Sequence, residues 1–249
     1  MTIFDRRRAI AACFAVVSTC AAFAATANTF TDGFDGNVID PVWWTTGESG
    51  GSTVVATNQR LELTQGAEGF AGLAFKAPVV GDFTVRLDYA LLVWPSDNKE
   101  RLALGAVASP AQQLLIERAS DSAVGIGTEI YVTDFTGQGI LGTPTADLSG
   151  TLRLERIGDT VRGSYLTPTG WNVVGTYSVI GESSLARSIG FSIFPGAPVT
   201  PGVKVALDNF YLDGPNVPVP EPGKLAMLMG GLALLAVVRA RPRKWRAPR

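Results

Sequence analysis

The chain has 249 residues, of which 46% are apolar, and it contains no histidine and only two cysteines. The lack of histidine excludes Ser-His-Asp and Cys-His catalysis, histidine-ligated zinc and a histidine pH switch. Residues 28–214 carry eleven Lys and Arg against 20 Asp and Glu, and this net charge of −9 argues against nucleic acid and anionic lipid as partners.

The first 27 residues have the pattern of a secretory signal peptide. Arginines at positions 6–8 precede an apolar run over residues 9–25, and Ala25-Thr26-Ala27 gives signal peptidase an Ala-x-Ala site. We expect cleavage before Asn28, and cleavage after Ala24 fits almost as well. Both cysteines lie within this segment, so the exported domain has no disulfide and depends on burial for its stability.

Residues 28–214 predict an all-β domain. Period-two alternation recurs about every ten residues, as where Phe83, Val85, Leu87 and Tyr89 alternate with polar residues. Further strands are expected at 61–64, 70–75, 101–108, 113–118, 124–135, 151–157, 161–166, 171–179, 189–194 and 204–212. So many short strands predict a two-sheet antiparallel jelly-roll sandwich, in which both inner faces form the core.

Two turns mark a three-strand meander between residues 152 and 171. The first is a tight turn at Gly158-Asp159, and the second lies at 167–170. The domain opens with Phe30-Thr-Asp-Gly-Phe34 and closes with an apolar strand over 205–212. Together these segments resemble the concanavalin A-like lectin and glucanase sandwich, including its laminin-G-like members. The resemblance implies a fold and carries no activity with it.

The last strand changes its apolar face part of the way along. Val205 and Leu207 share one parity, whereas Phe210 and Leu212 have the other. We therefore expect a β-bulge at Asp208-Asn209, because a bulge inserts one residue and moves the following side chains to the opposite face. Bulges often lie beside functional sites.

Three aspartates are candidates for a structural calcium ion. In sandwiches of the resembled fold the first and last strands run together, which would bring Asp208 near Asp32 and Asp35. Without histidine or a mature cysteine, only metals with oxygen ligands, such as calcium, remain. The spacing of Asp32-Gly-Phe-Asp35-Gly differs from that of helix-loop-helix calcium sites, and the alternative is that these residues form Asx turns at strand ends.

The domain contains no recognisable catalytic motif. A glycosidase needs two carboxylates that face each other about 5 to 10 Å apart. Glucanases of the resembled fold carry a Glu-x-Asp-x-x-Glu pattern on one strand, and no segment here matches it; Glu117 and Glu155 are isolated carboxylates. We therefore expect a domain that is not an enzyme and has no cofactor apart from the calcium ion considered above.

Three tryptophans are candidates for contact with sugar rings. Trp44, Trp94 and Trp171 lie in or beside predicted loops, and an exposed indole offers a sugar an apolar face and a polar edge. The alternative is that these side chains belong to the core, because aromatic residues contribute the largest buried areas there.

The C-terminal segment combines a proline-rich linker, an apolar run and a basic tail. The linker at 215–222 contains Pro220-Glu221-Pro222, residues 225–238 are apolar or small, and the cations that follow are Arg239, Arg241, Arg243, Lys244, Arg246 and Arg249. This order, with a hydrophobic helix and basic tail over 223–249, resembles the PEP-CTERM sorting signal. The resemblance implies that an exosortase recognises the segment, removes the apolar helix and passes the protein to the cell surface, often beside exopolysaccharide.

The physical chemistry of this segment agrees with a transient membrane anchor. A bilayer core about 30 Å thick needs roughly 20 apolar helical residues, so the run at 225–238 spans the inner membrane only marginally. The positive-inside rule keeps the basic tail in the cytoplasm. Prolines remove backbone donors and favour extended geometry, which leaves the linker open to a processing enzyme. An ordinary short membrane anchor is the alternative.

These observations favour an exported, exosortase-processed protein of the cell surface or extracellular matrix. Its sandwich is expected to be non-catalytic and to associate with glycans or exopolysaccharide, and its acidic surface is compatible with neutral glycans or cations. One alternative is a glycoside hydrolase or other carbohydrate-active enzyme on the same fold. The other is a purely structural matrix protein without a small ligand.

Overall fold

The computed structural model describes residues 28–218 apart from 68, 98, 136–137 and 196–199. The expected signal peptide, the PEP motif, the hydrophobic helix and the basic tail lie outside the described residues. Within the described part of the chain, no helix has the length and apolar character needed to cross a bilayer.

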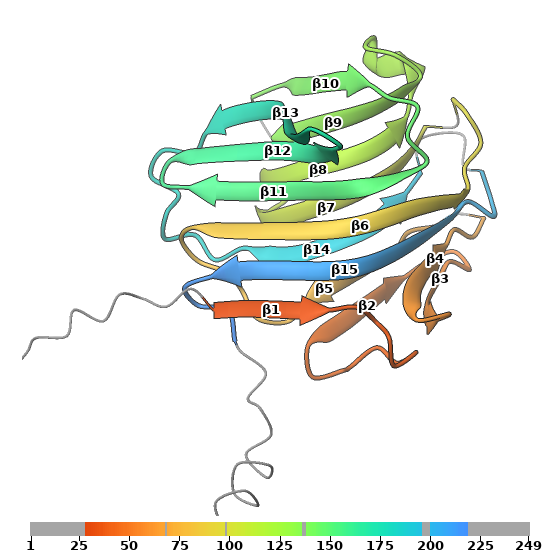
Figure 1. Ribbon diagram of the computed structural model, residues 1–249, viewed down its shortest axis with the longest axis horizontal. Coiled ribbons are helices and arrows are strands. Elements are labelled where there is room, and N and C mark those ends of the chain that lie inside the picture. The colour runs from red at the N-terminus through yellow and green to blue at the C-terminus, as the bar shows by residue number, and fades with distance from the viewer. Residues whose placement is uncertain (1–27, 68, 98, 136–137, 196–199, 219–249) are drawn as a thin grey trace, which may run out of the picture.

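Two antiparallel sheets pack face to face, with sheet A nearer the viewer in Figure 1. Sheet A has the order β13-β12-β11-β6-β15-β4-β3, with β1 also paired to β15. Its strands are β1 (Asn28–Asp32), β3 (Thr53–Thr57), β4 (Arg60–Thr64), β6 (Phe83–Val93), β11 (Ser149–Ile157), β12 (Thr160–Thr167), β13 (Gly170–Ser178) and β15 (Lys204–Gly214).

Sheet B has the order β10-β9-β8-β7-β14-β5-β2. Its strands are β2 (Trp44–Glu48), β5 (Ala71–Phe75), β7 (Glu100–Ser109), β8 (Gln112–Ser120), β9 (Glu129–Phe135), β10 (Ile140–Pro144) and β14 (Ser188–Phe194). The inner faces of the two sheets share one large aliphatic and aromatic core. The expected all-β sandwich of two antiparallel sheets is therefore confirmed.

The strongest sequence pattern gives the central strand of sheet A. Along β6, Phe83, Val85, Leu87 and Tyr89 are buried, while the residues between them are half-buried on the outer face. The expected meander is also present, because β11 pairs with β12 across a two-residue turn and β12 pairs with β13. Gly158 has a φ of 57° in the first turn, which glycine adopts without steric cost.

Four strands lie outside the predicted ranges, and each pairs with a neighbour on one side only: β1, β2, β3 and β10. β10 contains Gly142 and Pro144, which are unfavourable in strands, and β2 has a glycine among threonines. The strand expected over 124–135 begins only at Glu129. The reason is that Asp121 caps a short 3-10 helix, Ser122–Val124, and Gly125 then takes a φ of 79°.

The expected bulge in β15 is confirmed. The register of β15 against β6 shifts between Asp208 and Tyr211, and Asn209 has a φ of 50°. The Asn209 side-chain amide donates to Asp88 Oδ2 at 2.9 Å. Because the bulge adds one residue, Phe210 and Leu212 enter the core although their parity differs from that of Leu207.

Asn209→Ala is expected to lower the free energy of unfolding by about 1–2 kcal/mol, because alanine tolerates the left-handed conformation poorly and cannot donate to Asp88. Urea denaturation measures this loss. Asn209→Gly is the matched control, since it loses the same hydrogen bond without the backbone strain. The explanation fails if the glycine variant is the less stable of the two.

Candidate functional site

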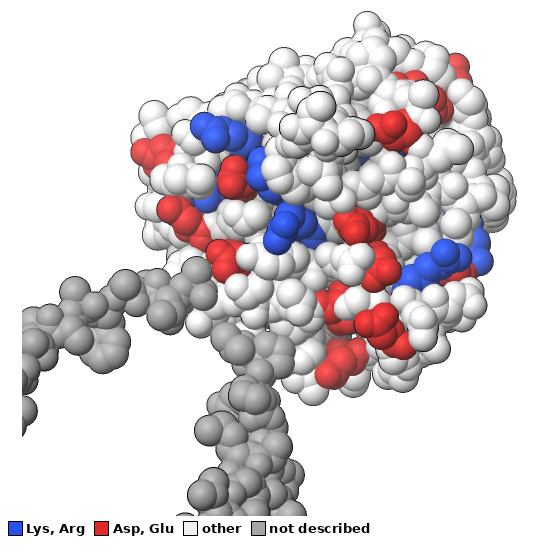
Figure 2. All heavy atoms as spheres, viewed as in Figure 1, with Lys and Arg blue, Asp and Glu red and all other residues white. Residues whose placement is uncertain are grey.

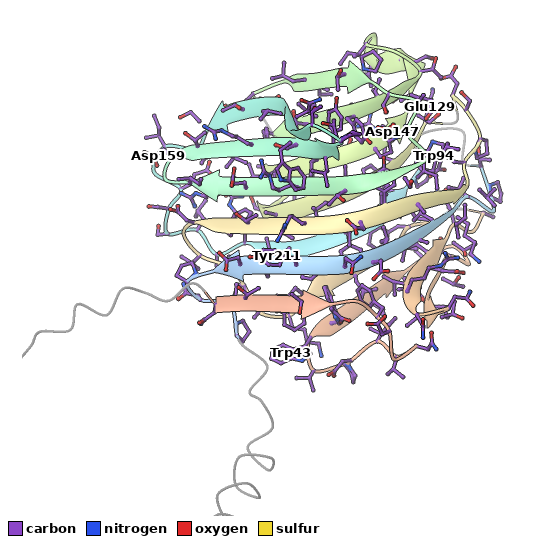
Figure 3. All side chains as sticks on the ribbon, viewed as in Figure 1. Trp43, Trp94, Glu129, Asp147, Asp159 and Tyr211 are labelled. Carbon is purple, nitrogen blue, oxygen red and sulfur yellow. The ribbon has the colours of Figure 1, made fainter. Side chains whose placement is uncertain are left out.

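A hollow of about 510 Å³ lies on the outer face of sheet A, lined by residues of β1, β6, β11, β12, β13 and β15 and of the loop after β1. The charged residues that line it are Asp32, Asp35, Arg86 and Asp88, and the aromatic ones are Trp171, Tyr211 and Phe210, of which Phe210 is buried in the core. Figure 2 shows this face of the molecule, on which acidic side chains gather beside basic ones. Figure 3 shows Tyr211 on β15 in the lower half of the same face.

The two aromatic side chains of the hollow are held by arginines. The guanidinium carbon of Arg86 lies 3.9 Å from the ring centroid of Tyr211, and that of Arg153 lies 4.2 Å from the ring of Trp171. Such cation–π contacts fix the orientation of both rings. Trp171 is half-buried and lines the hollow, so the structure leaves this predicted sugar contact on an accessible surface.

The acids of the hollow differ in their partners. Asp88 is half-buried and accepts hydrogen bonds from the Thr151 hydroxyl at 2.5 Å and from the Asn209 amide at 2.9 Å. It thereby connects three neighbouring strands of sheet A. Asp35 is exposed and makes no hydrogen bond or ion pair to another described residue. The hollow therefore combines a fixed carboxylate with one that is open to a ligand.

The three aspartates expected to hold calcium come near one another but do not form a metal cage. A Cβ built at Gly33 would lie 2.9 Å from Asp35 Oδ2 and 3.6 Å from Asp208 Oδ1. Both oxygens of Asp32 are engaged, one with the Phe34 N–H at 2.8 Å and the other with the Trp44 indole N–H at 2.7 Å. Among the described residues, no group of three His, Cys, Asp or Glu is placed to hold a metal ion.

Trp44 is not a surface contact for sugar, and this prediction is wrong. Its side chain is only 2% exposed, because β2 turns it toward the space between the sheets. It packs on a cluster of aromatic rings: Phe30, Phe34, Phe75, Phe191 and Phe210. Trp43 is the half-buried member of the pair and stacks on Phe75.

Trp94 lies away from the hollow. Its indole N–H donates to Glu129 Oε2 at 3.1 Å, and the Arg118 guanidinium carbon lies 5.9 Å from its ring centroid. Figure 3 shows Trp94 near Glu129 and Asp147 at the right-hand end of the strands, away from Tyr211. The predicted sugar contacts Trp94 and Trp171 therefore do not share one site.

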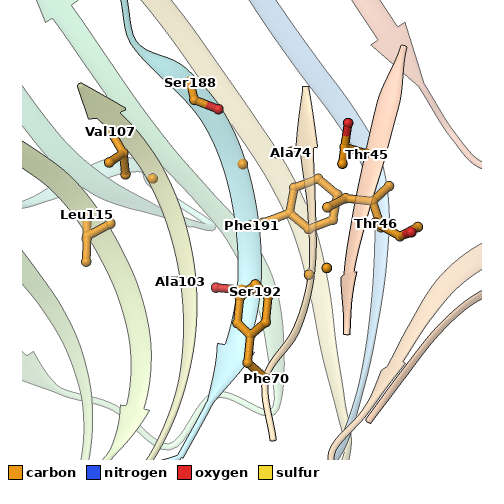
Figure 4. A pocket seen from close by; sticks show the side chains of 15 residues that line it. Thr45, Thr46, Phe70, Ala74, Ala103, Val107, Leu115, Ser188, Phe191 and Ser192 are labelled. Carbon is orange, nitrogen blue, oxygen red and sulfur yellow. The ribbon is translucent and has the colours of Figure 1, made fainter. Parts of the chain in front are cut away.

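A second hollow, of about 260 Å³, lies on the outer face of sheet B (Figure 4). Its floor consists largely of small residues, and Phe70 stands at one side with 41% of its surface exposed. A Cβ at Gly72 would lie 2.6 Å from the Phe191 carbonyl oxygen, and one at Gly190 would lie 2.8 Å from that of Leu73. The close approach of the strands thus accounts for these glycines without a ligand.

The two carboxylates considered for catalysis lie on different sheets. Glu117 is on the outer face of sheet B, is 1% exposed and forms an ion pair with Arg101 at 3.0 Å. Burial raises the pKa of Glu117 to about 7. Glu155 is on the outer face of sheet A, 4.0 Å from Arg153. Glu117 therefore has almost no surface for a substrate, and the two do not face each other across a cleft.

Sequence reasoning missed Arg86, Asp88 and Tyr211. The signal for the first two was present, because they alternate with the buried residues of β6 and so had to face outward. Tyr211 follows the bulge and has the parity opposite to Phe210. What the sequence does not display is the register that places Tyr211 opposite Arg86 and Arg86 opposite Arg153.

No family model and no curated protein matches the chain. Among solved structures, lectin II from Ulex europaeus is 13% identical, with 75% of this chain and 98% of the lectin covered and a TM-score of 0.55. The metal-free form of lectin I-B4 from Griffonia simplicifolia is 12% identical over 74% and 98% of the chains, with a TM-score of 0.52. A glycosyl hydrolase family protein from Mycobacterium fortuitum is 12% identical over 74% and 97%, with a TM-score of 0.53.

These similar structures are sandwiches of the concanavalin A-like lectin and glucanase type. They confirm the resemblance in fold that the strand pattern and turns suggested. Identities of 12–13% establish the fold alone.

Proposed function

We propose that this protein is an exported, non-catalytic jelly-roll sandwich that binds polysaccharide through the hollow on sheet A. The observation that carries the proposal is the combination of Trp171 and Tyr211 with hydrogen-bonding side chains around a volume of about 510 Å³. Binding sites of this kind combine apolar or aromatic walls with a few fixed polar groups. The lectin-like and glucanase-like fold supports an association with carbohydrate.

Export and sorting are part of the same proposal. Signal peptidase would remove residues 1–27, and an exosortase would process the segment after Pro220-Glu221-Pro222 and release the domain from its transient inner-membrane anchor. The two ends of the domain lie side by side. Asn28 pairs with Gly214 between β1 and β15, so the two segments expected to be removed are attached at the same end of the sandwich. The hollow lies toward the other end of β1.

Trp171→Ala is expected to weaken polysaccharide binding by about tenfold, because it removes one aromatic wall of the hollow. Affinity electrophoresis of the purified protein in gels containing single polysaccharides measures the change. Trp94→Ala is the matched control, since Trp94 is also half-buried but lies outside the hollow. Equal binding by the Trp171→Ala variant and the unaltered protein would exclude the hollow as the binding site.

The same preparations distinguish the two alternative functions. A protein without affinity for any polysaccharide would favour a purely structural role in the matrix. Turnover of any polysaccharide by the purified protein would favour a carbohydrate-active enzyme. Under the proposal we expect binding without turnover.

A further inference from the structure

The charges around the sheet A hollow indicate the class of its ligand. We infer that the hollow selects polysaccharides that carry free, protonated amino groups over anionic polysaccharides, an inference that rests on the function proposed above. The site is defined by its volume and its two aromatic rings. Its charged residues decide which sugars can occupy it.

Acids outnumber bases along the lining. Asp32, Asp35 and Asp88 line the hollow, and Arg86 is the one base among the described lining residues. Asp208 adds a fourth carboxylate next to Gly33 at the rim. Figure 2 shows acidic side chains on both sides of the central basic ones, with the densest group of acids in the lower part of this face.

The hydrogen bonds made by these acids leave their charge in place. The Asp32 oxygens accept from a backbone N–H and from the indole of Trp44, and Asp88 accepts from the Thr151 hydroxyl and the Asn209 amide. All of these donors are uncharged. The carboxylates are therefore held in position by uncharged donors, and they outnumber the two arginines, Arg86 and Arg153, that contact the aromatic rings of the hollow.

Arg86 keeps its positive charge but is fixed in position. Its guanidinium carbon lies 3.9 Å from the centroid of the Tyr211 ring, on the β6 and β15 side of the hollow. Asp35 is exposed and has no partner among the described residues. A sugar chain that starts at Trp171 would lie beside Arg153, which contacts that ring, and where the chain extends across the hollow toward β1 it would meet the open carboxylate of Asp35.

An ammonium group on the sugar would form an ion pair with Asp35. A uronate carboxylate would instead be repelled by the aspartates of the hollow. Neutral sugars would keep the contact with the rings but lack the ion pair. The expected order of affinity is therefore amino sugar, then neutral sugar, then acidic sugar.

Calorimetric titration of the purified protein with three oligosaccharides of equal length tests this order: a glucosamine hexamer, its fully N-acetylated counterpart and a hexauronate. The amino hexamer is expected to bind roughly fivefold tighter than the acetylated one, and Asp35→Asn should reduce this preference two- to fivefold. Asp159→Asn is the matched control, because it removes the same charge from an exposed turn outside the hollow. Added salt should reduce the preference as well.

The outcomes separate the inference from the proposed function. Equal affinity for the amino and acetylated hexamers, or tightest binding of the hexauronate, overturns the inference and leaves glycan binding intact. If the preference for the amino hexamer is unchanged in Asp35→Asn, or falls equally in Asp159→Asn, the preference does not arise in the hollow. If the protein binds none of the three hexamers and no other polysaccharide, the proposed function itself is wrong.

Discussion

Replacing Trp44 by alanine is expected to lower the free energy of unfolding by about 4 kcal/mol, within the range for large aromatic residues truncated in a core. The Trp44 ring lies at 4.9 to 6.1 Å, between centroids, from the rings of Phe30, Phe34, Phe75, Phe191 and Phe210. Removing it would leave a cavity among rigid rings that cannot easily collapse. It would also leave one oxygen of Asp32 without its indole donor.

Thermal unfolding provides the measurement. For a domain of this size, 1 kcal/mol corresponds to about 2–4 °C, so the melting temperature should fall by roughly 8–16 °C. Trp44→Phe separates the two contributions, because it keeps most of the packing and loses only the hydrogen bond to Asp32. Trp43→Ala is the control for a half-buried neighbour and should cost less. A loss for Trp44→Ala no greater than that for Trp43→Ala would contradict the assignment of Trp44 to the core.

The features of the fold that follow local pattern could be predicted from the sequence. β6 alternates over its apolar residues, and the change of parity between Leu207 and Phe210 revealed the bulge in β15. The edge strands β2, β3 and β10 could not be predicted in this way, because their pairing with a neighbour, more than their own composition, holds them in the sheet.

The candidate site was predicted only where local sequence pattern reveals it. Asp32, Asp35 and Trp171 stood out through turns and residue type, and the hollow brings them together. Trp44 was misplaced because two adjacent tryptophans in an extended segment face opposite sides, and composition does not tell which side is the core. Arg86 and Tyr211 become neighbours only through the register of β15 on β6, which is a long-range property.

Glu117→Gln is expected to make the stability of the protein less dependent on pH. Burial raises the pKa of Glu117 from its ordinary value of 4.5 to about 7. Between these values the folded chain keeps a proton that the unfolded chain has lost, so folding becomes less favourable as the pH rises. Glu117 alone can lower the free energy of unfolding by up to about 3 kcal/mol between pH 4.5 and pH 7.

Glutamine preserves the shape of the side chain and can still accept a hydrogen bond from Arg101, which also keeps its ion pair with Asp121 at 3.0 Å. The variant should therefore be more stable than the unaltered protein at pH 8 and similar to it at pH 5. The pKa of Glu100 is also raised to about 7 by burial, so part of the pH dependence should remain after Glu117 is replaced.

Urea denaturation at several pH values measures these differences, and a second carboxylate provides an internal contrast. Hydrogen bonds from Lys204 and Arg60 lower the pKa of Glu62 to about 2, so its contribution to stability is present above pH 4.5 and is lost as the pH falls toward 2. Glu62→Gln should therefore lower stability by a constant amount above pH 4.5, and its difference from the unaltered protein should shrink as the pH falls toward 2. If Glu117→Gln leaves the slope between pH 5 and pH 8 unchanged, Glu117 is ionised in the folded protein, and its ion pair with Arg101 outweighs its burial.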